Sequence, residues 1–258
     1  QLTATNDTTP AISVATDGTN RLQITSSSVV GGNINVRSNQ ELRFGTNNTE
    51  RVRITSAGLV GIGTTTPSSY DGGGNNLVIY EDGNAGLTIH SSTTGYGSIY
   101  FADGTTGNQL YRGILEYNHN ADYMALWTAA TEKARIDSSG RFLVGTSTAR
   151  TTFFNGIGLG PAIQIEGTGG GRMASIFSNN DDGGVLILGR QGGSTPGGNT
   201  LVANGNEIGL ITFQASDGTD PTECARIQAV IDGAPGNNDM PGRLVFSTTA
   251  DGASSPTE

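Results

Sequence analysis

The sequence predicts an all-β fold, arranged as an elongated fibrous array of short β-hairpin modules. Three observations carry this prediction: one segment recurs along the chain, apolar and polar residues alternate within each copy, and glycine is abundant. The chain has 258 residues, of which 40 are glycine, and only 34% belong to the hydrophobic set. This composition leaves few side chains for a globular core and is typical of fibrous β-proteins.

The recurring segment defines the modules. Residues 42–64 align without a gap with residues 124–146, and residues 12–26 follow the same pattern more loosely. A related stretch covers residues 209–227, and residues 242–258 repeat its strand, its Asp-Gly turn and its Thr-Glu pair. Repetition of this kind marks an array architecture. From the Gly and Pro clusters between copies we expect modules at residues 1–68, 69–150, 151–205 and 206–258.

Each full module is expected to form a β-hairpin. Apolar residues alternate with polar ones on both sides of a turn rich in Asn and Gly, and this period of two is typical of a half-buried strand. Asn and Gly tolerate the positive φ angles of a tight turn, and Gly58 is expected to make a second turn before another short strand. The predicted core of the repeats is Leu42, Phe44, Val52, Ile54, Leu126, Ile136, Phe213, Ile227 and Phe246. The one helix candidate, residues 120–136, is argued against by its alignment to a hairpin.

A hairpin with one thin apolar face is marginal in water, so this face needs a cover. Neighbouring modules could stack on it, or identical chains could pair around a long axis. The recurring glutamates at 50, 132, 223 and 258 are unevenly spaced, which argues against a uniform single-chain solenoid. The expected assembly is therefore an intertwined homotrimer, with a shaft like a β-helix or β-prism.

Charge and cysteine content limit the partners. The 14 Lys and Arg residues against 23 Asp and Glu give a formal charge of -9, so nucleic acid is not an expected partner. The single cysteine, Cys224, excludes an intrachain disulfide and is expected to be a small buried hydrophobe. No run of about 18 apolar residues occurs, so no membrane insertion is expected. The Gly-rich stretches lack the lysine of a phosphate loop and the nine-residue calcium repeat, so no cofactor is expected.

Carboxylates for a glycan-cleaving site can be proposed in two places, but both have ordinary turn compositions. A sugar cleft is also often lined with Trp, and Trp127 is the only one. The chain is therefore not expected to be an enzyme. The candidate acids are Asp181 with Asp182, and Asp217 with Asp220 and Glu223.

Histidine offers a weak signal for a metal. His90 and His119 each lack a second histidine at the spacing that strengthens a metal site. Three copies around an axis would present three imidazoles from one position. The simpler expectation is that both are surface or strand-packing residues and that no metal is bound.

Glutamate and arginine recur together at the predicted second strand of three modules. On a regular strand, residues i and i+3 point to opposite faces, so an ion pair within one strand is not expected. Two alternatives stay open: ion pairs between chains, or a solvated rim whose charges keep exposed strand edges from aggregating. The pairs are Glu50 with Arg53, Glu132 with Arg135, and Glu223 with Arg226.

The stretches "ERVRITSAGLVGIGTTTP", "GSIYFADGTTG" and "GGNTLVANGNEIGLITFQASDGTD" resemble the shaft modules of tailed-bacteriophage tail fibres. In that family such modules often precede a C-terminal intramolecular chaperone, which trimerises the fibre and cleaves itself off. The resemblance implies a non-catalytic virion protein that is made in the host cytoplasm, joins other tail proteins and serves host attachment, with host surface glycans as a partner. A glycan-depolymerising tailspike and a bacterial surface adhesin or filament subunit stay open as alternatives.

The end of the sequence resembles the start of another module. Thr257 and Glu258 occupy the place that Thr49 and Glu50 hold before their Arg-Ile strand. A strand at residues 244–247 without its hairpin partner would leave one row of backbone donors and acceptors unpaired. We therefore expect the encoded folding unit to continue beyond Glu258.

Overall fold

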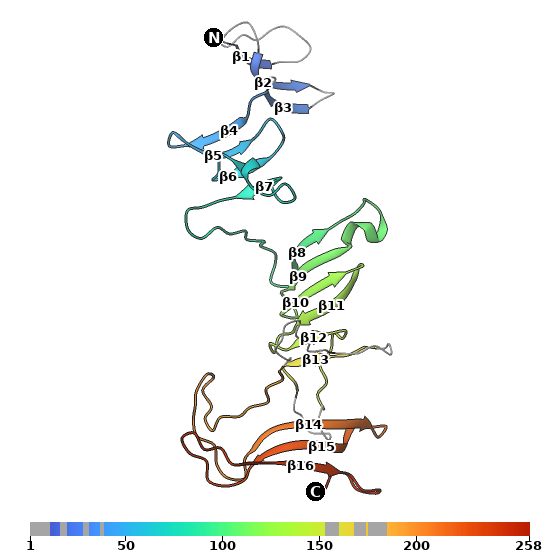
Figure 1. Ribbon diagram of the computed structural model, residues 1–258. Helices are drawn as coiled ribbons and strands as arrows, with labels where there is room; N and C mark the ends of the chain where they lie inside the picture. Colours follow the sequence, from blue (N-terminus) through green and yellow to red (C-terminus); the bar gives the residue numbers. More distant parts are fainter. Residues whose placement is uncertain are drawn as a thin grey trace. The chain divides into compact units, whose positions relative to one another are not determined.

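The structure, a computed structural model, describes residues 11–15, 20–27, 31–36, 39–152, 160–167, 174 and 185–258. These residues contain sixteen strands and two short 3₁₀ turns, which confirms the predicted all-β class. The chain divides into two units, residues 1–88 and 89–258, each of which is described by itself (Figure 1). Among the described residues no helix is long and apolar enough to cross a membrane.

The first unit holds two sheets. An antiparallel sheet has the order β1-β2-β3, from β1 (Ala11–Ala15), β2 (Asn20–Ser27) and β3 (Gly31–Val36). A second sheet has the order β4-β5-β6-β7, from β4 (Leu42–Thr46), β5 (Thr49–Ile54), β6 (Val60–Ile62) and β7 (Leu77–Ile79). Its first three strands are antiparallel, whereas β7 is parallel to β6 and follows the 3₁₀ turn η1 (Pro67–Ser69).

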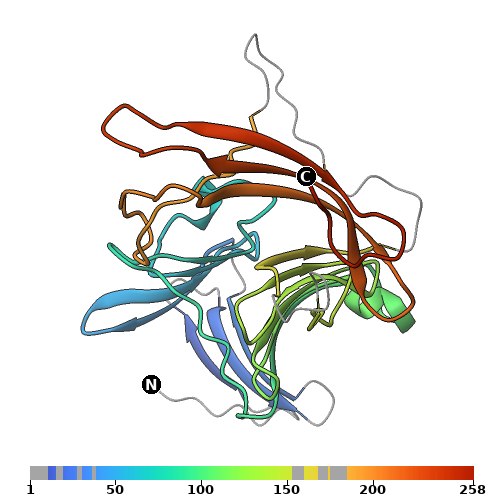
Figure 2. The ribbon, with the colours of Figure 1, turned by 90° about the horizontal axis from the view of Figure 1, so that it is seen from below.

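The second unit also holds two sheets. The larger is formed by β8 (Tyr96–Phe101), β9 (Gly113–Asn118), β10 (Tyr123–Thr128), β11 (Thr131–Ile136), β12 (Phe142–Val144) and β13 (Ile163–Ile165), in that order. All its neighbours are antiparallel except β12 and β13, and the 3₁₀ turn η2 (Gly107–Tyr111) lies between β8 and β9. The smaller sheet is antiparallel, with the long strands β14 (Glu207–Ser216), β15 (Pro221–Ile231) and β16 (Gly242–Thr248) side by side (Figure 2).

The two copies that align without a gap fold in the same way. The turn of the first copy has positive φ at Asn47 and Asn48, 52° and 56°, as a two-residue hairpin turn requires. The second copy has alanines there, Ala129 and Ala130, and they adopt 52° and 59°. The second segment is therefore a hairpin, β10 to β11, and the helix candidate is excluded as predicted.

A β-bulge interrupts the second strand of the repeated hairpin at the same place in all four sheets. In β5, Glu50 and Val52 face two consecutive residues of β4, so Arg51 is an extra residue without a partner across the ladder. The extra residues in β2, β11 and β15 are Arg21, Lys133 and Cys224. The prediction that Cys224 is buried was wrong: its side chain is exposed, because it occupies this extra position.

The sheets place module boundaries differently from the sequence prediction. The expected boundary at 68/69 separates β7 from β6, although these strands pair, and the boundary at 150/151 likewise separates β13 from β12. Each of these parallel strands has only three residues. Such a short strand leaves no recognisable period in the sequence.

Near the end of the sequence, an isolated antiparallel bridge joins Thr248 and Thr257. Thr248 at the end of β16 and Thr257 exchange two backbone hydrogen bonds, 3.3 and 3.1 Å long. In the hairpin of β14 and β15, Ala215 and Thr222 face each other at the corresponding place. The repeat observed in the sequence is thus present in the backbone pairing. Along its length, β16 also pairs with β15.

One glycine in each copy is required by a close approach of the chain. Gly63 and Gly145 have φ angles of 74° and 76°. A Cβ atom would lie 2.0 Å from the carbonyl oxygen of Tyr80 in the first case and 1.9 Å from that of Glu166 in the second. Both carbonyls belong to the residue that directly follows the parallel strand. A glycine is therefore needed for this strand to pair with its neighbour, β6 or β12, without a steric clash.

We expect Gly145→Ala to destabilise the second unit by about 2 to 5 kcal/mol, because a forced side chain adds to the cost of a left-handed backbone. Gly140→Ala is the matched control, since Gly140 also has a positive φ, 76°, but nothing lies within 4 Å of its added Cβ. It should cost only about 1 to 2 kcal/mol. Thermal melting compares the two variants, and equal losses would show that β13 does not dock at this glycine.

Candidate functional site

Every sheet has one face that carries large apolar side chains and that the described residues leave largely uncovered. In the six-stranded sheet, two neighbouring rows of paired residues make up this face. One row is Ile99, Leu115, Leu126, Ala134, Val144 and Ile165, and the next is Gly97, Tyr117, Met124, Ile136, Phe142 and Ile163. Most of the large side chains in both rows are exposed. We call these rows, and their equivalents in the other sheets, the apolar face.

The equivalents follow from the same registers. In the four-stranded sheet the rows are Leu42, Ile54, Val60 and Leu77, and Phe44, Val52, Ile62 and Ile79. In the C-terminal sheet the central row is Ile211, Ile227 and Phe246, flanked by Phe213 and Leu244. In the N-terminal sheet Ile24 pairs with Ile34 and Leu22 with Val36. All four sheets therefore carry large apolar side chains on one face.

All nine predicted core residues lie on the apolar face, but the single chain buries none of them fully. Leu42, Val52 and Ile227 are half-buried, whereas the other six are exposed. The equivalent positions expected for Ile54 and Ile136 are found, with exposed fractions of 37% and 48%. Their burial at a common depth would need a partner and stays a prediction. Among the described residues, the buried hydrophobic ones are Val78, Ile114, Ala125, Ala134, Leu143, Val230, Ile231 and Val245.

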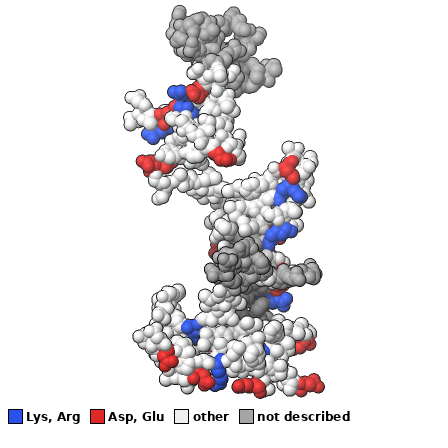
Figure 3. All heavy atoms as spheres, in the orientation of Figure 1, with Lys and Arg blue, Asp and Glu red and all other residues white. Residues whose placement is uncertain are grey.

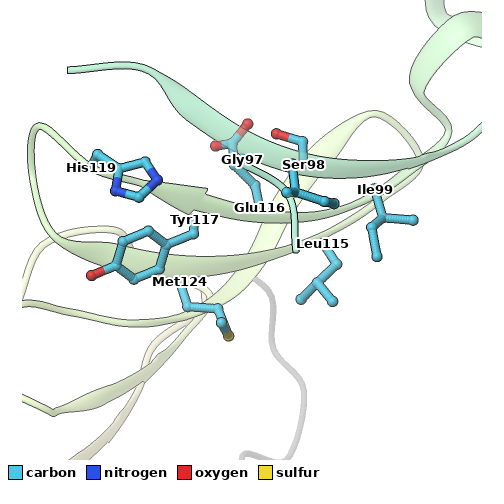
Figure 4. Close-up of a pocket in the computed structure, with 9 residues that line it drawn as sticks. Gly97, Ser98, Ile99, Leu115, Glu116, Tyr117, His119 and Met124 are labelled. Carbon is cyan, nitrogen blue, oxygen red and sulfur yellow. The ribbon is translucent and has the colours of Figure 1, made fainter. Parts of the chain in front are cut away.

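The apolar face of the six-stranded sheet contains a shallow hollow of about 260 Å³ near β8, β9 and β10. Figure 4 shows Leu115, Tyr117 and Met124 on one side of this sheet and Glu116 on the other. His119 packs edge to face against Tyr117, with 5.0 Å between the ring centroids. His119 is thus a strand-packing residue, as the simpler sequence interpretation expected.

In three of the four sheets the opposite face carries a Glu-Arg pair. The expectation that no ion pair forms within one strand was wrong, whereas pairing between chains, one of the two alternatives, stays a prediction. Arg53 donates to Glu50 at 2.6 Å, and the equivalent N···O distances are 2.5 Å for Arg135 with Glu132 and 2.9 Å for Arg226 with Glu223. The bulge is the cause, because its extra residue shifts the alternation and brings positions i and i+3 to one face.

The second alternative, a solvated rim of charges, does not fit these pairs, because some of their side chains are buried. Arg53 is 8% exposed and Glu223 only 1%. The hydrogen bond from Arg53 holds the pKa of Glu50 below its usual value. Glu223 additionally accepts a hydrogen bond from the hydroxyl of Thr212 at 2.8 Å. More exposed charges also pair: acidic and basic side chains adjoin near β4 and β5 (Figure 3), where Arg43 contacts Glu41 at 2.7 Å.

A third charge accompanies the pair in the second copy. Glu116 on β9 is 7% exposed and lies on the same face as Glu132 and Arg135. Burial raises the pKa of Glu116, the charge of Glu132 raises it further, and Arg135 opposes both. Arg135 also lies over the ring of Tyr123, 3.9 Å from its centroid. Sequence analysis missed Glu116, because strands β8 and β9 have no counterpart in the first copy.

The described acids proposed for catalysis are held in turn and ion-pair contacts. The carboxylate of Asp217 accepts hydrogen bonds from the backbone of Thr219 and Asp220, which holds its pKa below the usual value. It therefore shapes a turn, as its composition predicted. Glu223 is buried in its ion pair. Asp181 and Asp182 lie outside the described residues. Among the residues that are described, no three His, Cys, Asp or Glu side chains are grouped so that they could hold a metal.

A scan against protein-family models finds no matching family. A search of curated proteins finds no match either. The geometry of the sheets, and above all their apolar face, is therefore the basis for assigning a function.

We expect Glu116→Gln to stabilise the protein at pH 7. Because the folded state raises the pKa of Glu116, its contribution to stability is present below the unfolded pKa of about 4.3 and is lost as pH rises through the folded pKa. The neutral glutamine avoids that loss. The melting temperature should thus rise at pH 7, and the difference from the parent chain should vanish below about pH 4.

Glu132→Gln is the matched control on the same face. It leaves the guanidinium of Arg135 without its carboxylate partner and should cost about 1.5 to 3 kcal/mol at pH 7. Melting curves of both variants between pH 4 and pH 8 provide the measurement. A Glu116→Gln variant that melts lower than the parent at pH 7 would mean that the ionised carboxylate is favourably bound after all.

Proposed function

We propose that this chain is a segment of a homotrimeric virion fibre, which serves host attachment by spacing and adhesion rather than by catalysis. The observation that carries the proposal is the apolar face, which recurs in all four sheets. The resemblance of the repeats to tail-fibre shaft modules supports the same function.

The apolar face needs a partner on energetic grounds. Burying one large apolar side chain contributes about 1.5 to 3 kcal/mol, and each sheet leaves several of them open. Soluble monomers rarely leave contiguous apolar patches of this kind in water. The described part of the chain instead buries only a small set of residues, so most of its apolar side chains can be stabilised only by association.

Identical chains are the partner that fits best. The apolar face occurs at the same position in each module, so copies aligned side by side would cover every sheet at once. Three sheets with their apolar faces turned inward enclose a closed triangular core. Two copies would instead form a face-to-face sandwich. We favour three because the modules resemble those of trimeric fibres, and a measured mass distinguishes the two arrangements.

No observation favours the alternative of a glycan depolymerase, because the described candidate acids serve a turn and a buried ion pair. A bacterial surface adhesin or filament subunit would use the same assembly. Genes neighbouring the coding sequence, together with electron micrographs of purified particles, separate a virion protein from a cell-surface protein. Localisation to the virion and contact with other tail proteins belong to this proposal.

We expect light scattering to give a mass of three times 26.5 kDa at micromolar concentration. Ile136→Asp should abolish assembly, because a carboxylate would be buried in the apolar core. Tyr100→Asp is the control: Tyr100 is 57% exposed, yet its pairing with Ile114 places it on the opposite face, so the trimer should persist. A monodisperse, folded monomer of the parent chain would refute the proposal, and a twofold mass would replace the trimer by a sandwich.

A further inference from the structure

A second hollow, of about 460 Å³, lies at one end of the C-terminal sheet and shares no residue with the apolar face. Two loops line it. One precedes β14 and contributes Arg190, Asn199 and Thr200, and the other joins β15 to β16 and contributes Asn237, Asn238 and Met240. Its volume falls in the range of small-molecule sites, about 300 to 1,000 Å³.

The first loop is held in shape by its own hydrogen bonds. The side-chain amide of Gln191 donates to the carbonyls of Gly193 and Thr195 at 2.7 and 3.1 Å, and its oxygen accepts from the N–H of Gly193 at 2.8 Å. The N–H of Gly192 donates to the carbonyl of Thr200 at 2.8 Å. The hollow is therefore largely formed before any ligand arrives.

The two loops are also tied to each other and to the sheet. The N–H of Gly233 donates to the side-chain oxygen of Asn204 at 2.9 Å. The N–H of Gly205 donates to the carbonyl of Ile231 at the end of β15, also at 2.9 Å. In the second loop, Gly236 and Asp239 form an antiparallel bridge. These bonds fix the spacing between the walls of the hollow.

The hollow presents polar groups that the protein itself uses little. The side chains of Asn199, Asn237 and Asn238 are exposed, and they carry planar amides with donors and an acceptor each. The guanidinium of Arg190 makes one long contact, 3.4 Å to the carbonyl of Glu207. Eight other described arginines form ion pairs, whereas Arg190 has no carboxylate within reach among the described residues.

The geometry points to a binding site for an acidic saccharide, in which Arg190 binds a carboxylate and the asparagines bind hydroxyl groups. A guanidinium matches a carboxylate with two parallel hydrogen bonds. Amides match vicinal hydroxyls, and the exposed side chain of Met240 offers an apolar contact for the C–H face of a sugar ring. Arg190 is the one charged residue in the lining, so the hollow favours an anion; Asp239 belongs to the second loop but does not line it.

This inference deepens the proposed role in host attachment, because it names the class of surface glycan and where it binds. The probes are methyl β-D-glucuronide and methyl β-D-glucoside, which differ by a carboxylate against a hydroxymethyl group. NMR titration of the purified protein should show that the glucuronide binds about tenfold more tightly, the value of one charge-assisted hydrogen bond. Arg190→Gln should remove this preference while weak binding of both saccharides remains.

Arg51→Gln is the matched control, since Arg51 is another exposed arginine without an ion pair among the described residues, and it lies in the other unit. It should leave both titrations unchanged. No binding of either saccharide, or a preference for the glucuronide that survives Arg190→Gln, would overturn the inference. Light scattering on the same samples keeps the two proposals apart: a trimer that binds neither saccharide refutes only this site, and a monomer that binds the glucuronide refutes only the fibre assembly.

Discussion

The β-bulge in the second strand of each module is the constraint on which the two-faced sheets depend. In a regular strand, Glu50 would share a face with Val52 and Ile54, because their positions differ by even numbers. The extra residue Arg51 shifts that alternation, so the acid moves to the face of Arg53 and the apolar residues keep the other face to themselves. The same shift occurs at Lys133 and Cys224, where it brings Glu132 to the face of Arg135 and Glu223 to the face of Arg226.

The two copies also show that strands can be added to a module while one face stays apolar and the other keeps its Glu-Arg pair. Strands β8 and β9 widen the second sheet and enlarge its apolar face. The added strand β9 brings Glu116 to the polar face beside a pair that is already complete. Because Glu116 is buried there beside Glu132, its pKa is raised, and its ionised form is disfavoured. Such a charge is tolerated because Arg135 partly offsets it.

The hairpins and the equivalence of Ile54 with Ile136 could be predicted from the sequence, because alternation and the Asn-rich turn of the first copy are local signals and the second copy aligns with the first. The Ala129-Ala130 turn carries no such signal of its own. The bulges could not, since one extra residue leaves the composition of the strand unchanged, and this is why no Glu-Arg pair within one strand was expected. Strands β7 and β13 were missed because three residues carry no period. The hollow beside Arg190 is formed by two loops more than thirty residues apart in the sequence, so no local sequence pattern predicts it.

Cross-linking tests most directly whether copies of the chain meet at the apolar face. In a Cys224→Ser background, Ile136→Cys places one thiol on this face, and Tyr100→Cys places one on the opposite face as the reference. Mild oxidation of the assembled protein should join Ile136→Cys chains into covalent dimers, while Tyr100→Cys chains stay single. If oxidation left Ile136→Cys chains single as well, or joined only Tyr100→Cys chains, the apolar face would not be where copies meet.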